Sequence, residues 1–197
     1  MHLSWIETLG FITGAVCVLL AVKENVWNWP IGILNNVVYL VVFWHSKLYA
    51  DSGLQLFYIA ISVYGLWCWL YGGKKHTQLA ISRVTRNAAR MLFAVSIASA
   101  GILYYVLGHF TDSNVPLGDA VTTAMSLTAQ YMLGRKMIEN WLVWIAADVL
   151  YIGLYCYKSL YLTALLYAIF IAMCVAGYLR WQRTMSKPAV LAEAAEA

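Results

Sequence analysis

The chain has 197 residues, of which 62% are hydrophobic and 11% are charged, whereas soluble domains are about 45–50% apolar and about 25% charged. This composition excludes a soluble globular domain and indicates an integral membrane protein. The formal net charge of +4 does not indicate nucleic-acid binding, because the basic residues lie between apolar runs and form no stripe with interleaved aromatic residues.

Long apolar runs follow one another along almost the whole chain. A helix needs about 20 apolar residues to cross about 30 Å of hydrocarbon, and its backbone must satisfy its own hydrogen bonds there. Seven runs approach this length, at residues 5–22, 29–45, 53–71, 91–107, 117–134, 141–157 and 160–179. We therefore predict an all-α membrane protein with seven transmembrane helices.

The basic residues predict which side of the membrane each loop faces. When seven spans alternate, 11 of the 13 Lys and Arg residues fall on one side, and only Lys47 and Lys158 fall on the other. Cytoplasmic loops carry an excess of Lys and Arg. We expect a multi-pass protein of the bacterial inner membrane with the N-terminus outside and the C-terminus in the cytoplasm.

The loops divide the chain into four parts. Residues 1–72 and 111–183 each hold three of the predicted spans. Residues 73–110 combine a loop that carries five basic residues with the fourth span. Residues 184–197 contain Ala-Glu-Ala repeats and no aromatic residue, so we expect a flexible cytoplasmic tail there, either disordered or a frayed helix.

An internal repeat relates the two three-span parts. When positions 28–69 are aligned without gaps on positions 140–181, 13 of the 42 places are identical. The matches include Asn28-Trp29 with Asn140-Trp141, Tyr39 with Tyr151, Gly65 with Gly177, and Trp69 with Trp181. Because an offset of four spans returns the chain to the same side, we predict two parallel three-helix repeats joined by a linker helix (3+1+3). In such proteins the substrate lies between the repeats near the membrane midplane.

The sixth predicted span has a polar and aromatic face, which the second span mirrors. Residues spaced three and four apart lie on one side of a helix. In the sixth span these residues are Trp141, Trp144, Asp148, Tyr151 and Tyr155, and in the second span they are Trp29, Gly32, Asn36, Tyr39 and Phe43. Two such faces suit one flat ligand.

Asp148 lies inside its span, roughly 10 Å from the span's end at about 1.5 Å per residue, where an ionised carboxylate costs several kcal/mol. We interpret it as the counter-charge of a cationic substrate, to which Trp and Tyr faces add cation–π attraction. The alternative is that Asp148 bonds a Tyr, Ser or Thr of a neighbouring helix and only fixes packing. Trp29 and Trp141, at span ends, fit an interfacial aromatic belt equally well.

Glutamines in the third and fifth spans complete the candidate site. An amide side chain supplies a donor and an acceptor together, which suits amide and hydroxyl groups of a ligand; a polar contact between helices is the alternative. The predicted substrate-binding residues are Trp29, Asn36, Tyr39, Gln55, Gln130, Trp141, Trp144, Asp148 and Tyr151.

Other functional classes find little support in the residues. The four cysteines stand alone and the four histidines form no facing pair, so we predict no metal site, disulfide framework or cofactor. A retinal receptor requires a lysine in its last span, and residues 160–179 contain none. No nucleophile has a base placed for an intramembrane enzyme.

With these residues in view, the chain resembles the PnuC-type vitamin transporter family, which is related to the SWEETs, over residues 5–183. Trp141, Trp144 and Asp148 are similar to the family's sixth-span signature Trp-x-x-Trp-x-x-x-Asn/Asp. Residues 48–55 are similar to the beginning of the family's third span.

The resemblance implies uptake of nicotinamide riboside by facilitated diffusion without ion coupling, with a cytoplasmic kinase that traps the product by phosphorylation. It also implies that family members can form homotrimers, and that relatives carry thiamine or riboflavin. Asp148 disfavours riboflavin, which is neutral, but it does not separate nicotinamide riboside from thiamine, because both are aromatic cations.

Overall fold

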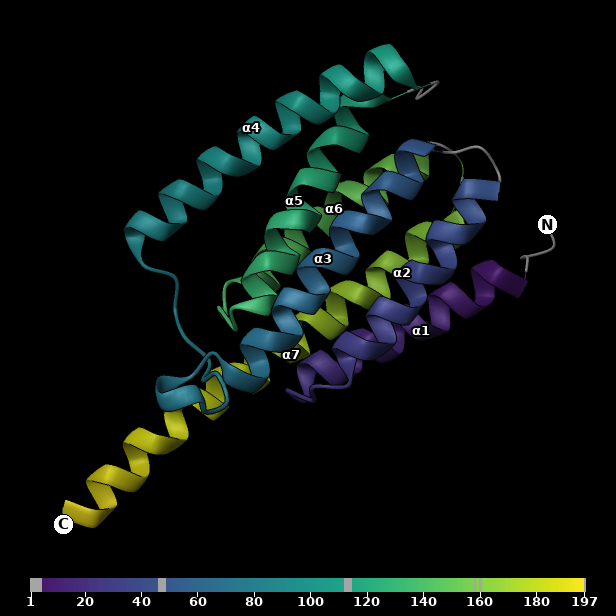
Figure 1. Cartoon of the computed structure of the whole chain (residues 1–197). Coiled ribbons are helices and arrows are strands. Elements are labelled where there is room, and N and C mark those ends of the chain that lie inside the picture. Colours follow the sequence, from purple (N-terminus) through teal and green to yellow (C-terminus); the bar gives the residue numbers. More distant parts are fainter. Residues whose placement is uncertain (1–4, 46–48, 112–114, 158, 160, 197) are drawn as a thin grey trace. The chain divides into compact units, whose positions relative to one another are not determined.

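The computed structural model describes residues 5–45, 49–111, 115–157, 159 and 161–196, and this part of the chain is all-α (Figure 1). Its helices are α1 (Trp5–Val22), α2 (Asn28–His45), α3 (Tyr49–Tyr71), the short 3-10 helix η1 (Lys74–His76), α4 (Arg86–Phe110), α5 (Pro116–Gly134), α6 (Asn140–Tyr157) and α7 (Tyr161–Glu196). The prediction of an all-α protein is confirmed. Lys47 and Lys158, which entered the orientation argument, lie outside the described residues.

Four of the described helices are long and apolar enough to cross a membrane: Ser52–Tyr71, Arg86–Phe110, Asn140–Tyr157 and Thr163–Ser186. Large apolar side chains cover their outer surface. On α4, for example, Phe93 is 69% exposed, Ile102 66% and Phe110 74%. Such a surface suits lipid as the solvent, so the chain is a multi-pass membrane protein.

The chain divides into two compact units, Met1–Ala80 and Ile81–Ala197. In the first unit α2 packs against both α1 and α3. In the second unit α6 packs against both α5 and α7, and α4 packs against α5. Helix α4 therefore belongs to the second unit, which begins at Ile81, inside the part that the sequence predicts at residues 73–110.

The turns before α2 and α6 have the same backbone structure. Glu24 and Lys136, which are equivalent in the repeat, both have a left-handed conformation, with φ of 55° and 48°. Their N–H groups donate to the carbonyl three residues earlier, at 3.0 Å in both turns, and the following N–H donates five residues back, at 2.8 and 2.9 Å. Helices commonly end in this way. The alignment that pairs the sequences thus also pairs the local structure.

Helix α4 begins earlier than predicted, at Arg86 instead of residue 91. The hydroxyl of Thr85 accepts a hydrogen bond from the N–H of Ala88 at 3.3 Å, which is the usual arrangement at a helix N-terminus. The prediction counted Arg86 and Arg90 as loop because it relied on apolar length alone.

Helix α7 ends later than predicted, at Glu196 instead of residue 179. Residues 184–196, for which we expected disorder or a frayed helix, have a helical backbone. Ala, Leu and Glu are good helix formers, and this propensity does not depend on an apolar face that packs.

Candidate functional site

The polar face of α6 carries four of the predicted site residues. Trp141 and Asp148 are buried, with 2% and 4% of their surface exposed, and Trp144 and Tyr151 are half-buried. Because α6 packs against both α5 and α7, side chains of these two neighbours can reach this face. The predicted signature residues of the second unit thus lie on one helix, α6, between its two neighbours α5 and α7.

The Asp148 carboxylate meets a thiol. Sγ of Cys174 in α7 lies 3.9 Å from Oδ2 of Asp148 and donates to it, and no other side chain within the described ranges forms a hydrogen bond with this carboxylate. A thiol is a weak donor. The Tyr, Ser or Thr partner considered as an alternative is therefore not found, and the acid is buried with little compensation.

Three tyrosines form a cluster on α6 and α7. The ring of Tyr167 lies 4.8 Å from that of Tyr151 and 5.2 Å from that of Tyr155, and the last two are stacked at 6.1 Å. The hydroxyl of Tyr151 is 3.5 Å from that of Ser126 in α5. The cluster supplies ring faces of the kind that attract cations.

Tyr167 is a member of this cluster that the sequence analysis missed. It lies on α7, a helix for which the sequence predicts no site residue. A signal was present, because the repeat pairs Tyr167 with Gln55, a residue that was selected. Applying the repeat to every candidate would have found it.

Trp29 and Trp141 pack in the same way within their own units. The ring of Trp141 meets that of Trp181 edge to face at 5.4 Å and 82°. The ring of Trp29 meets that of Trp69 at 5.5 Å and 86°. Trp29 at the beginning of α2 and Trp141 at the beginning of α6 are thus each held by a tryptophan of the following helix.

A glycine makes room for each of these indoles. A Cβ atom on Gly177 would lie 2.6 Å from Cζ2 of Trp141, and one on Gly65 would also collide with Trp29. Both indoles are nearly inaccessible, at 2% and 1% exposed. In this conformation Trp29 and Trp141 are core residues of their units, and a substrate could touch little of them.

Four buried polar atoms near these tryptophans have no hydrogen-bond partner in the described part of the chain. They are Oδ1 of Asn28, Nε1 of Trp29, Oδ1 of Asn140 and Nε1 of Trp141. The repeat pairs the first two with the last two, which again shows the same local structure in both units.

The other predicted residues of the first unit are Asn36, Tyr39 and Gln55, and all three are half-buried. Tyr39 stacks on Phe43 at 5.7 Å, as Tyr151 stacks on Tyr155. The hydroxyl of Tyr39 lies where a Cβ on Gly10 of α1 would be. Asn36 takes the place of Asp148 in this unit. In the second unit Gln130 is half-buried on α5.

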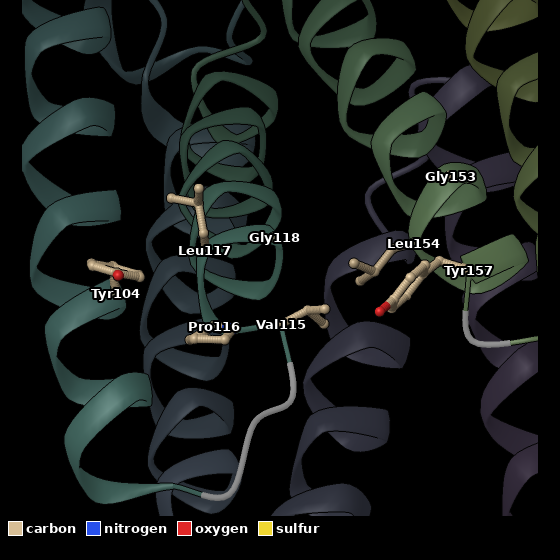
Figure 2. A pocket seen from close by; sticks show the side chains of 8 residues that line it. All are labelled: Tyr104, Val115, Pro116, Leu117, Gly118, Gly153, Leu154 and Tyr157. Carbon is tan, nitrogen blue, oxygen red and sulfur yellow. The ribbon is translucent and has the colours of Figure 1, made fainter.

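A separate cavity of about 520 Å³ lies in the second unit, at one end of α4, α5 and α6 (Figure 2). Tyr104 of α4 lines one side and Leu154 and Tyr157 of α6 the other, with Leu117 of α5 between them. Every lining residue is uncharged, and none belongs to the predicted site. The cavity therefore offers no counter-charge for a cation.

The described side chains offer binding groups more than reactive ones. Among them, no three His, Cys, Asp or Glu residues are placed to hold a metal ion. The second unit provides a buried carboxylate and a set of tyrosine rings and hydroxyls close to it. This combination can bind a flat, positively charged molecule.

The family model described as "Nicotinamide mononucleotide transporter" matches residues 4–183. The chain belongs to this family, the PnuC-type nicotinamide mononucleotide/riboside transporters. It is a transporter and not an enzyme.

Relatives within this transporter family cover almost the whole chain. The nicotinamide riboside transporter PnuC of Escherichia coli (strain K12) is 26% identical over 204 residues, which span 91% of this chain and 85% of that protein. PnuC of Neisseria mucosa is 26% identical over 200 residues, spanning 93% and 74%. The riboflavin/roseoflavin transporter RibM of Streptomyces davaonensis is 25% identical over 183 residues, spanning 91% and 85%.

A solved structure has the same fold. The crystal structure of the vitamin B3 transporter PnuC is similar with a TM-score of 0.71 and 26% sequence identity, covering 93% of this chain and 83% of that one. The likeness in both sequence and fold makes this chain a vitamin transporter of the PnuC family.

Proposed function

We propose that this transporter takes up nicotinamide riboside by facilitated diffusion. The observation that carries the proposal is the buried carboxylate of Asp148, whose one side-chain partner among the described residues is a thiol. The pyridinium ring of nicotinamide riboside is a flat cation, so it supplies the positive counter-charge that the Asp148 carboxylate lacks. The relatives from E. coli and N. mucosa are nicotinamide riboside transporters by name, which supports the same substrate here.

Electrostatics favours a cation over a neutral ligand of the same shape. Two opposite unit charges about 4 Å apart attract by about 4 kcal/mol at an effective dielectric constant near 20. Tyrosine faces add about 0.5–2 kcal/mol for each cation–π contact. A neutral ligand gains neither contribution and leaves the carboxylate without its counter-charge.

The proposed site combines the signature face of α6 with groups that recognise the rest of the ligand. Asp148 provides the counter-charge, and Tyr167 joins the residues selected from the sequence. Glutamine side chains suit the carboxamide and ribose hydroxyls, because each provides a donor and an acceptor. The proposed ligand contacts are Asn36, Tyr39, Gln55, Gln130, Trp144, Asp148, Tyr151 and Tyr167, whereas Trp29 and Trp141 hold their helices from the core of each unit.

The proposed mechanism is alternating access between two parallel three-helix repeats, α1–α3 and α5–α7, with α4 as linker. The duplicated turns and tryptophan–glycine contacts support the repeat. In this arrangement all seven helices span the membrane, with the N-terminus outside and the C-terminus in the cytoplasm, where basic loops are retained. A cytoplasmic kinase then phosphorylates the product, which prevents its return.

A binding panel on the purified protein tests the substrate. We expect saturable binding of nicotinamide riboside, and binding of its neutral reduced form, dihydronicotinamide riboside, that is weaker by at least about tenfold. Thiamine is the second candidate, because the same carboxylate suits its aromatic cation. Binding of thiamine alone would overturn the substrate, and binding of riboflavin alone would overturn both the substrate and the counter-charge.

A further inference from the structure

Cys174 lies where it can hold the Asp148 carboxylate in place. Both side chains are buried, each 4% exposed, and they come from the neighbouring helices α7 and α6. The thiol is 3.9 Å from the carboxylate oxygen and donates to it. We propose that Cys174 is a positioning residue, which keeps the counter-charge in the orientation that meets the cation. This proposal rests on the proposed function of Asp148.

The repeat gives this position a counterpart in the first unit. Ser62 takes the place of Cys174 and is 1% exposed, and Asn36 takes the place of Asp148. A small side chain that can donate a hydrogen bond thus recurs at equivalent positions of α3 and α7. The unit with the carboxylate has a thiol there, and the unit with the amide has a hydroxyl. Because a thiol donates weakly, it orients the acid and leaves most of its charge available to the ligand.

Three variants of Cys174 separate the donor from the volume of the side chain. Ala and Val both remove the donor, and Val also fills most of the space. We expect the Kd for nicotinamide riboside to rise about fivefold in Cys174→Ala and Cys174→Val, as for the loss of one weak hydrogen bond to a charged group. Cys174→Ser retains a donor, and we expect its Kd to stay within about twofold of the wild-type value.

A matched control and a second ligand exclude a purely structural role. Cys68 is also fully buried, and no hydrogen bond of its thiol is found in the described residues. Cys68→Ala should therefore leave the Kd unchanged. The Kd for neutral dihydronicotinamide riboside should not change in Cys174→Ala, so that the preference for the cation falls by the same factor.

The outcomes are distinguishable. An unchanged Kd for the cation in both donor-free variants would overturn the positioning role, and so would an equal loss of affinity for the cation and its neutral form. Asp148→Ala, measured in parallel, tests the proposed function by itself: if it binds the cation as the wild type does, the counter-charge fails whatever Cys174 does.

A different observation concerns the connection between the units. On the first-unit side, the N–H of Leu79 donates to the carbonyl of Trp69 at 3.2 Å. On the second-unit side, the N–H of Ser82 donates to the carbonyl of Lys136 at 3.0 Å, and its carbonyl accepts from the N–H of Ile138 at 2.9 Å. The connection is therefore attached to each unit.

The attachment to the second unit continues up to the linker helix. The N–H of Val84 donates to Oε2 of Glu139 at 2.9 Å, and α4 begins two residues later. Between Leu79 and Ser82 stand only Ala80 and Ile81, whose N–H groups have no partner in the described part of the chain. The two units also divide between these residues. We infer that Ala80 and Ile81 form the pivot when one unit moves against the other.

Proline substitution tests the pivot. Ile81→Pro fixes its own φ at about −65° and restricts the residue before it, and it removes no hydrogen bond described above. We expect the initial rate of uptake to fall about fivefold or more with an unchanged Kd, because the conformational step and not binding becomes slower. Gln78→Pro, in the same loop but before Leu79, should leave both quantities unchanged.

Ala80→Pro restricts the same pair of residues and provides a second measurement if Ile81→Pro folds poorly. Uptake at the wild-type rate in either proline variant that retains binding would overturn the pivot. An equal loss of rate in Gln78→Pro would also overturn it, because stiffness anywhere in the loop would then explain the effect.

Discussion

At the scale of single residues, positions 36 and 148 are equivalent in the repeat but differ in charge. Asn36 and Asp148 have nearly the same shape, and only Asp148 can neutralise a cation. We expect Asp148→Ala to abolish saturable uptake, and Asp148→Asn to weaken binding of nicotinamide riboside by at least about tenfold, because it removes the Coulomb attraction. Isothermal titration of the purified variants measures the change in Kd.

The same variants should bind dihydronicotinamide riboside as the wild type does. An equal loss of affinity for both ligands in Asp148→Asn would show that Asp148 acts through packing and not through charge. Expression and thermal stability, measured on the same preparations, show whether the variant is folded.

Tyr167 allows the ring and the hydroxyl to be tested apart. Tyr167→Phe keeps the aromatic face and should change the Kd for the cation less than about twofold, whereas Tyr167→Leu should raise it about threefold or more through the lost cation–π attraction. Tyr161→Leu, at an exposed position on the same helix, is the control. A larger effect of Phe than of Leu would point to the hydroxyl instead of the ring.

The sequence pattern selects Asp148 but neither Tyr167 nor Cys174, for one physical reason. Spacing along a helix shows which residues share a face, and it does not show which side chains of a neighbouring helix meet that face. Trp141 illustrates the same limit. An aromatic residue at a span end fits a lipid belt, a binding site or a core, and the contact with Gly177 decides for the core in this conformation.

At the scale of helices, close packing depends on glycines that face an indole. Gly177→Ala places a Cβ 2.6 Å from the ring of Trp141, and we expect about 1–3 kcal/mol of destabilisation from this overpacking. Gly153→Ala is the matched control, because a Cβ there has nothing within 4 Å and alanine is the better helix former. Thermal unfolding in detergent compares the two.

The glycine prediction fails if both variants melt at the same temperature. Gly65→Ala provides an independent repetition, because its Cβ would collide with Trp29 in the first unit. Since the two contacts are equivalent in the repeat, we expect the two losses of stability to be similar.

Helix bounds were predictable where polar residues end an apolar run. Residues 5–22 match α1, and residues 141–157 match α6 within one residue. The beginning of α4 was not predictable in this way, because its first turn carries Arg86 and Arg90 and is stabilised by the Thr85 cap. The length of an apolar run reflects the thickness of the membrane, and a helix can extend beyond the membrane into polar residues.

At the scale of the whole molecule, equivalent positions of the two halves have the same backbone conformation even where their residues differ. Glu24 and Lys136 carry opposite charges, yet both adopt the left-handed conformation that usually favours glycine. The turn was therefore not predicted from turn-forming residues. It follows from the register of the repeat, which places the same helix ends on both sides of the turn.

The proposed orientation is tested by labelling single cysteines in a variant that lacks the native ones. Lys75→Cys lies in the exposed basic loop, and Ser159→Cys lies between α6 and α7. We expect a membrane-impermeant maleimide to label position 75 only from the cytoplasmic side and position 159 only from the outside. The reverse pattern would invert the topology.

The carboxylate at position 148, with an amide at position 36, also determines the electrical behaviour of the carrier. If Asp148 stays within its unit while the ligand passes, each cycle moves one net positive charge across the bilayer. A potential of about 100 mV, negative inside, favours entry of that charge by about 2.3 kcal/mol, which is about a 50-fold accumulation. We expect vesicles with an imposed inside-negative potassium diffusion potential to accumulate the cation, and its neutral reduced form to ignore the voltage. The membrane voltage of the cell would then concentrate the vitamin without a coupled ion.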